Sequence, residues 1–342
     1  MAPIDKLTAV AEAIRSKTGK TESMTLEQMA TEIAGIQTGD NWIGDGNTHI
    51  WISLSEGRTS PMLGVVVEGT VTVDWGDETP PDVLTGTSAS AVQWTPTHEY
   101  AAPGEYIITL TVEGKMSIVG DTDRACILRC SSVRDNLDYS YLSAVQRVEI
   151  GDGVSSIGAF AFANLNAMSA IIIPDSVDIN ANGAFTKCSS LLAIDIPDAT
   201  GSIGTNMLNG CESILSISFH SSVKNIGGYS ISGCSSLRSV TIEGNVNSIG
   251  ANAFYGCQSI SSVVIRGNVN RIASKAFANC YCVKFYDFGN CTAIPSLGAA
   301  DVFNSIAPDC EIRIPAALYD EWVAATNWSN YADYIVAKEV TE

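Results

Sequence analysis

The sequence has few basic residues, since Lys and Arg total 19 against 37 for Asp and Glu, and the formal net charge is −18. Such a charge repels phosphate backbones and anionic lipids at long range, so we expect no nucleic-acid partner. The chain also has no apolar run of the ~20 residues that a bilayer-spanning helix needs. Charges such as Asp5 and Arg15 interrupt the N-terminal stretch. We therefore expect neither membrane insertion nor a secretory signal peptide.

Residues that could form a catalytic centre are equally scarce. The three histidines, His49, His98 and His220, are widely separated, and no serine or cysteine motif accompanies them. The sequence contains no GxSxG, HExxH or GxxxxGK motif. These absences predict a protein that is not an enzyme and that needs no cofactor.

Five of the ten cysteines recur at a constant spacing of 23 residues: Cys188, Cys211, Cys234, Cys257 and Cys280. Free cysteine is small and readily buried, so a thiol at the same place in each repeat predicts a structural column inside the fold. Five cysteines in one column cannot all pair as disulfides. Zinc binding is disfavoured because Cys280 and Cys282 are not in CxxC spacing and no histidine lies nearby.

Apolar pairs separated by one residue keep the same 23-residue phase, and this period of two predicts a strand in each repeat. The pairs are Val148/Ile150, Ile171/Ile173, Ile194/Ile196, Ile217/Phe219, Val240/Ile242 and Val263/Ile265. Later columns at Ile249, Phe254 and Ile260 suit a turn followed by a short helical segment. One repeat cannot bury its own apolar face, so the repeats must stack, with their strands forming a parallel sheet along one side.

The repeats resemble a known family. Segments such as VTIEGNVNSIGANAFYGCQSI and SISFHSSVKNIGGYSISGCSSL resemble the BspA-like leucine-rich repeats of bacterial surface and phage-associated proteins. The resemblance covers residues 147–307 and implies a solenoid. It departs from the pattern at Asn180, at Leu165 in place of the first cysteine, and at Pro295 and Phe303, where the solenoid is expected to end.

Both ends of the solenoid are expected to carry caps. Residues 121–146 keep only part of the repeat phase and predict an N-terminal capping rung. Residues 308–342 predict a last strand followed by an amphipathic helix, with Leu318, Trp322 and Ala325 on one face. This segment also resembles the terminal cap of many proteins with the same repeat.

Residues 1–37 predict a helical pair. The first helix has Leu7, Val10 and Ile14 on one face, and Thr25 and Gln28 form a capping box for the second. The string KLTAVAEAIRSKTGKTESMTLEQMATEIAGIQ resembles the N-terminal segment of phage and prophage tail-associated proteins. The resemblance implies that residues 4–36 attach to virion tail or baseplate proteins. A helix-turn-helix DNA reader is the competing interpretation, and the few basic residues on the second helix disfavour it.

Residues 38–46 predict a linker, and the alternating strands of residues 47–120 predict a small β-sandwich. The strings VDWGDETPP and THEYAAPGEYIITLTV resemble the PKD-type immunoglobulin-like fold, which implies a spacer or adhesion module. Asp74, Asp77 and Glu78 are weak calcium candidates because they lack a full spaced set of ligands. Asp at such a turn more often bonds its own backbone.

The expected fold is therefore multidomain and mainly β with short helices. Side chains between the paired apolar residues should point outward from the solenoid sheet. The resulting ligand-binding candidates are Asp195, Ser218, Thr241, His220, Glu243 and Arg266. A carboxylate pair spanning two repeats could also hydrolyse a glycan, so a glycan depolymerase is a third hypothesis.

The leading hypothesis from the sequence is a non-enzymatic tail-fibre or baseplate protein of a virion that presents the solenoid to a glycan or protein of the host cell surface. The alternative is a BspA-like adhesin that is exposed on a bacterial cell or secreted. A homo-oligomer is compatible with either hypothesis.

Overall fold

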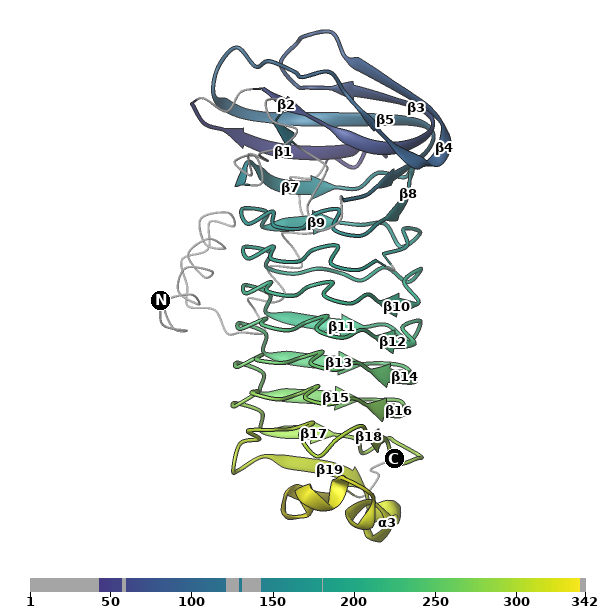
Figure 1. The fold of residues 1–342 in the computed structure, drawn as a ribbon, viewed down its shortest axis with the longest axis vertical. Coiled ribbons are helices and arrows are strands. Elements are labelled where there is room, and N and C mark those ends of the chain that lie inside the picture. Colours follow the sequence, from purple (N-terminus) through teal and green to yellow (C-terminus); the bar gives the residue numbers. More distant parts are fainter. Residues whose placement is uncertain (1–42, 57–59, 121–128, 131–142, 180, 339–342) are drawn as a thin grey trace.

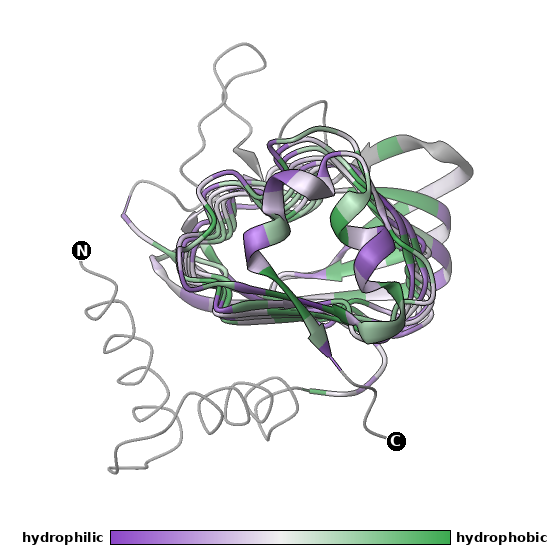
Figure 2. Ribbon diagram, turned by 90° about the horizontal axis from the view of Figure 1, so that it is seen from below, coloured by the Kyte–Doolittle hydropathy of each residue, from purple (hydrophilic) through white to green (hydrophobic). Residues whose placement is uncertain are grey.

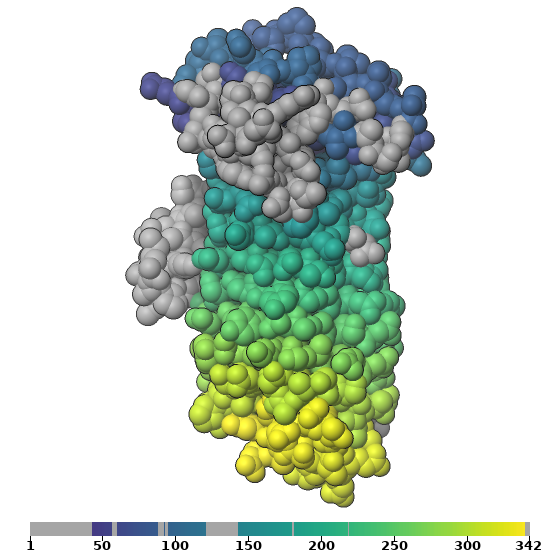
Figure 3. Space-filling view, in the orientation of Figure 1, coloured from purple at the N-terminus to yellow at the C-terminus, as the bar shows by residue number. Residues whose placement is uncertain are grey.

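The computed structural model describes residues 43–56, 60–120, 129–130, 143–179 and 181–338. Only the backbone is described at strand residues 88–91, 93–94, 129–130 and 218. These parts form one elongated column, in which the N-terminal strands lie on one end of a solenoid (Figures 1 and 3). The predicted helices of residues 1–37 lie outside the described residues, and so does most of the predicted capping rung.

The strands of the repeats form a parallel sheet, as their period of two predicted. The sheet contains β11 (Ser216–Phe219), β13 (Ser239–Ile242), β15 (Ser262–Ile265), β17 (Phe285–Asp287), β19 (Glu311–Pro315) and β20 (Ile335–Lys338). Ile217 pairs with Val240 and Val240 with Val263, so neighbouring strands are offset by one full repeat. In earlier repeats β7 (Val145–Glu149) pairs with β9 (Ala170–Ile172) in the same parallel sense.

The strand predicted at Ile194 and Ile196 is absent, although both side chains are buried. The next residue, Pro197, lacks one bond of the ladder, as does Pro174 in the same column after β9. In later repeats the equivalent Glu243 N–H donates to the Phe219 carbonyl oxygen (3.0 Å), which extends the ladder. Proline has no N–H, so the repeat at residue 197 cannot make this bond.

Most repeats contribute a second strand, in a segment for which the sequence predicted a turn; among its described residues, the repeat of residues 171–193 has only an isolated bridge, between Ser156 and Asp178. These strands are β8 (Val154–Ile157), β10 (Ser202–Ile203), β12 (Asn225–Ile226), β14 (Val246–Ile249), β16 (Val269–Ile272) and β18 (Ser296–Leu297). The last five form a second parallel sheet in the order β10-β12-β14-β16-β18. Columns of β-branched residues such as Ile226, Ile249 and Ile272 were the sequence signal for it.

The prediction of a short helix in each repeat was wrong, because these segments are successive turns. Two positions per repeat, four residues apart, have positive φ, which a right-handed helix cannot accommodate. The first column is 160, 183, 206, 229, 252 and 275, and the second is 164, 187, 210, 233, 256 and 279. Several backbone N–H groups therefore donate to the next repeat, as Phe162 does to the Ala184 carbonyl (2.8 Å) and Leu208 to that of Ser230 (2.7 Å). We call this side of the solenoid the turn face.

The five regularly spaced cysteines lie inside the solenoid, free and buried. Each thiol donates to a carbonyl oxygen 26 residues earlier, for example Cys211 to Phe185 (3.0 Å) and Cys257 to Ile231 (3.1 Å). Beside them, stacked rings such as Phe254 and Phe277, with centroids 5.0 Å apart, fill the interior. Sulfur and aromatic columns thus make the core continuous from one repeat to the next.

The N-terminal strands continue the solenoid. They are β1 (Thr48–Leu54), β3 (Gly64–Asp74), β4 (Asp82–Trp94) and β5 (Gly104–Ile118), arranged antiparallel in the order β4-β3-β5-β1. β1 pairs with β7, and β5 pairs with β8. Only the short pair β2 (Pro61–Met62) and β6 (Arg129–Cys130) lies outside this sheet among the described N-terminal strands. The strands of the expected sandwich therefore also cover the first repeat of the solenoid.

The opposite end carries short helical turns, at the place where the sequence predicted a cap. They are η2 (Ala316–Leu318), α3 (Tyr319–Ala324) and η3 (Trp328–Tyr334), and they lie across the end of the coil (Figure 2). Trp322 and Trp328 are fully buried, and the Trp328 indole N–H donates to the Pro295 carbonyl (2.7 Å). Within the described parts of the chain, no helix is long and apolar enough to cross a membrane.

Candidate functional site

The outward side of the β11–β20 sheet holds the binding candidates. Ser218 pairs with Thr241 and Thr241 with Val264, so these residues stand in one column. Thr241 and Val264 are partly exposed, whereas the side chain of Ser218 is outside the described parts of the structure. The column therefore offers the partly exposed side chains of Thr241 and Val264 on neighbouring strands.

His220 and Asp195, both binding candidates, lie together in space. The His220 Nε2 is 3.4 Å from an Asp195 carboxylate oxygen, and its Nδ1 is 3.4 Å from Asp198. All three side chains are exposed, so water screens the attraction and the contact adds little stability. The group orients the imidazole at the edge of the sheet and leaves it accessible to a partner.

The other two charged candidates, Glu243 and Arg266, form a second pair between adjacent repeats. The Arg266 Nε lies 3.2 Å from a Glu243 carboxylate oxygen, with both side chains exposed. Together with His220 and Asp195, this pair gives the sheet edge alternating acidic and basic groups, a pattern that suits polar recognition. In the described residues, no group of three or more His, Cys, Asp or Glu side chains could hold a metal ion.

Two of the calcium candidates, Asp74 and Asp77, make hydrogen bonds in and beside the turn of Trp75, Gly76 and Asp77, which we call the WGD turn. Asp74 accepts from the Gly76 N–H (2.9 Å), while Asp77 accepts from the Thr79 hydroxyl (2.6 Å) and contacts His98 Nε2 (2.9 Å). Burial alone would raise the pKa of Asp77, but the bonds from Thr79 and His98 outweigh it and lower that pKa. Glu78, with a φ of 65°, is exposed. The two aspartates therefore organise the turn through these bonds.

The ring stack behind this turn gives His98 a structural role. His98 stacks on Trp75 with centroids 4.5 Å apart, and the buried Tyr100 hydroxyl donates to the Trp75 carbonyl (2.9 Å). The Trp75 indole N–H donates to Asp82 (2.9 Å). The WGD turn is thus held by rings and hydrogen bonds from three separate segments.

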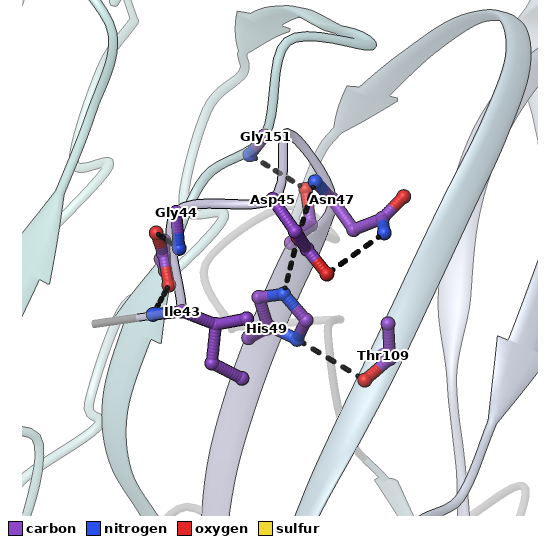
Figure 4. Close-up of polar contacts among 9 residues, drawn as sticks. Ile43, Gly44, Asp45, Asn47, His49, Thr109 and Gly151 are labelled. Carbon is purple, nitrogen blue, oxygen red and sulfur yellow. Dashed lines mark hydrogen bonds and ion pairs between the residues drawn. The ribbon is translucent and has the colours of Figure 1, made fainter. Parts of the chain in front are cut away.

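A buried polar junction joins the predicted linker to the first repeat (Figure 4). The Glu149 carboxylate accepts from the backbone N–H groups of Ile43 (3.0 Å) and Gly44 (2.9 Å). The Gly151 N–H donates to the Thr48 hydroxyl (2.9 Å). Residues 43 and 44 are therefore tied to a residue that is more than a hundred positions away in sequence. We call this set of contacts the Glu149 junction.

His49 occupies the adjoining part of the junction and is 2 % exposed. Its Nε2 lies 2.8 Å from Asp45, and its Nδ1 lies 3.1 Å from the Thr109 hydroxyl, so the ring connects the linker to β5 (Figure 4). The bond from His49, together with that from the Asn47 N–H, lowers the pKa of Asp45 to about 2. No local sequence pattern identified Glu149 or His49 as junction residues, because their partners are distant in sequence or belong to a predicted linker.

Comparisons with known proteins agree with the repeat assignment. Residues 155–284 match the BspA type leucine rich repeat region, in six copies. A T. pallidum leucine rich repeat protein is 22% identical over 49% of this chain and 71% of its own, with a TM-score of 0.39. A leucine-rich repeat protein from Eubacterium ventriosum is 16% identical over 60% of this chain and 75% of its own, with a TM-score of 0.28.

A leucine rich cell surface protein from Faecalibacterium prausnitzii is 18% identical over 61% of this chain and 84% of its own, with a TM-score of 0.25. No curated protein matches the chain. The matched segment contains the column of buried thiols, and it contributes strands to both parallel sheets. Residues 155–284 are thus a leucine-rich repeat region of the BspA type.

Proposed function

We propose that this protein is a non-enzymatic binding protein of a bacterial cell surface, and that the outward side of the β11–β20 sheet engages its partner. The observation that carries the proposal is the unbroken register of this sheet, with Thr241 and Val264 in one outward column. A solenoid surface of this kind suits an extended glycan or protein. The BspA repeat type supports placement on a cell surface.

A virion tail or baseplate component is the second candidate. It rests on the resemblance of residues 4–36 to tail-associated proteins, and these residues lie outside the described part of the chain. The Glu149 junction is compatible with such a role, because it fixes Ile43 and Gly44, the residues that follow this segment in the sequence, on the first repeat. Antibody labelling of intact bacteria and of purified phage particles separates the two placements.

The depolymerase hypothesis receives less support from the arrangement of charges. Glu243 pairs with Arg266, and Asp195 with His220. A glycosidase instead needs two carboxyl groups on opposite sides of a scissile bond, one of them protonated. Incubation with purified capsule, followed by measurement of released reducing ends, tests this hypothesis.

Substitution on the sheet tests the binding proposal directly. Thr241→Arg combined with Val264→Arg places two long cations on the outward column without disturbing the buried side. Cell binding by the labelled protein should fall about tenfold or more, equivalent to ~1.4 kcal/mol. The control is Asn247→Arg, at an exposed position of β14 on the second sheet. Equal binding by all three proteins would rule out this sheet as the contact surface.

A further inference from the structure

Three exposed tyrosines form a regular series on the turn face. In the described part of the repeat region, the large apolar side chains that are exposed are Tyr229 (46%), Tyr255 (37%) and Tyr281 (51%). Each lies 26 residues after the previous one, which is one repeat plus three positions. The three side chains therefore step diagonally across successive repeats.

Backbone hydrogen bonds connect the turns that carry these residues. Ser232 donates from its N–H to the Tyr229 carbonyl (3.2 Å) and from its hydroxyl to the Tyr255 carbonyl (3.2 Å). The Gly256 N–H in turn donates to the Ala278 carbonyl (3.0 Å), three positions before Tyr281. The diagonal thus lies on one continuous surface of linked turns.

The backbone at Tyr229 lies in the left-handed region, which bulky side chains seldom adopt. Tyr229 has a φ of 54°, and the other repeats have Phe160, Gly183, Asn206, Asn252 and Lys275 in the same column. A bulky side chain in this conformation costs about 1–2 kcal/mol. The ring is nearly half exposed, so part of its face is free to contact a ligand.

The turns around the tyrosines carry amides and hydroxyls, beside exposed charged residues such as Lys275 and Glu212. Asn209, Asn252 and Gln258 are among the exposed or partly exposed residues of these turns, and the Asn209 amide donates to the Tyr229 carbonyl (3.5 Å). Aromatic faces pack against the C–H faces of sugar rings, while amides and hydroxyls bond to sugar hydroxyls. Surfaces rich in Tyr, Ser, Gly and Asn also make adaptable polar contacts. The net charge of −18 opposes a polyanion.

We propose that Tyr229, Tyr255 and Tyr281 form a stacking surface for a neutral polysaccharide. The surface is distinct from the β11–β20 sheet and does not depend on the role proposed for that sheet. Because the three rings cross three repeats, the surface suits a linear chain that spans several sugar units.

Residues from the equivalent positions of other repeats can replace the three tyrosines and should keep the backbone of each turn. Tyr229→Asn, Tyr255→Ser and Tyr281→Gln introduce the residues that occupy the same columns at Asn206, Ser232 and Gln258. The triple variant should therefore keep the thermal stability and circular dichroism of the parent protein. Tyr319→Ala, at an exposed tyrosine of the C-terminal cap, is the control.

Affinity electrophoresis of the full chain in gels containing hydroxyethylcellulose, soluble starch, mannan or polygalacturonate tests the proposal. We expect at least one neutral polymer to retard the parent protein and Tyr319→Ala, and the triple variant to lose at least about tenfold in affinity, ~1.4 kcal/mol. Retardation only by polygalacturonate, retardation by none of the polymers, or equal retardation of the triple variant would overturn it. Loss of cell binding in the sheet variant alone would leave this result unaffected.

Discussion

Gly69 and Gly114 face each other across β3 and β5, and both have positive φ, of 125° and 119°. A Cβ on Gly69 would lie 2.2 Å from the Glu113 carbonyl oxygen, and one on Gly114 would lie 2.3 Å from that of Glu68. Gly86 continues the row on β4, opposite Gly69. This row lies where β5 changes partner, since its first half pairs with β1 and its end pairs with β8. The glycines let three strands pass together from one side of the solenoid to the other.

We therefore predict that Gly69→Ala destabilises the protein by roughly 3 kcal/mol. The positive φ strains any residue with a Cβ, and that Cβ would also clash with the backbone of β5. Gly256→Ala is the matched control: its φ is 72°, but no atom lies within 4 Å of the added Cβ. The control should lose only about 1–2 kcal/mol. Urea unfolding measures both variants, and equal losses would contradict a close approach at Gly69.

The sequence predicted the column of buried thiols and the main parallel sheet because both depend on a repeat within one chain segment. It did not predict the turn face, although Gly210, Gly233 and Gly256 stand in one of the left-handed columns. The apolar residues of that segment also fit a helix, and their spacing alone does not distinguish the two structures. The glycine column was the local signal against a helix.

The Glu149 junction could not be read from local patterns at all. Glu149 follows Val148 in a strand, where an acidic residue normally faces water, yet it is 8 % exposed. Its partners are backbone N–H groups. Every residue except proline carries one, so the residue types do not identify these partners. The same limit applies to the pairing of β1 with β7, which joins strands of different predicted domains.

Asp45→Asn should reduce stability near neutral pH and have no effect in strong acid. The folded-state pKa of Asp45 is lowered to about 2, chiefly by the bond from His49, against an ordinary value of 3.8. Its contribution is thus complete above pH ~4 and disappears as the pH falls through about 2. Because the Asp45 side chain is 42% exposed, we expect a loss of only about 0.5 kcal/mol.

Unfolding curves from pH 7 to pH 2 check this dependence. The curves of parent and variant should converge as acid is added. Asp195→Asn, at a carboxylate that is 83% exposed, should show a smaller difference throughout. A gap between parent and Asp45→Asn that was as large at pH 2 as at pH 7 would contradict an electrostatic role for Asp45.

Alkylation of the native protein should distinguish the exposed cysteine from the buried column. Cys282 is exposed, whereas burial raises the pKa values of Cys257 and Cys280 well above the ordinary range. A buried thiol with a raised pKa provides little thiolate for reaction. Iodoacetamide at pH 8 should therefore label Cys282 before the column, whose thiols should react only after unfolding. Peptide mass spectrometry reads each site, and labelling of Cys257 as fast as Cys282 would contradict a closed core.

Removal of residues 1–120 should cause the remaining solenoid to aggregate. β1 supplies the antiparallel partner of β7, and β5 supplies the partner of β8, so the deletion uncovers the first strand of both sides. An uncovered strand edge presents unpaired N–H and C=O groups to other molecules, and a solenoid without its cap also exposes its core. Removal of residues 1–42 is the control, because it leaves β1 and β5 in place. Size-exclusion chromatography should show defined particles for the shorter deletion and large aggregates for the longer one. A soluble 121–342 fragment that melts at the same temperature as the whole protein would mean that the N-terminal strands are an independent domain.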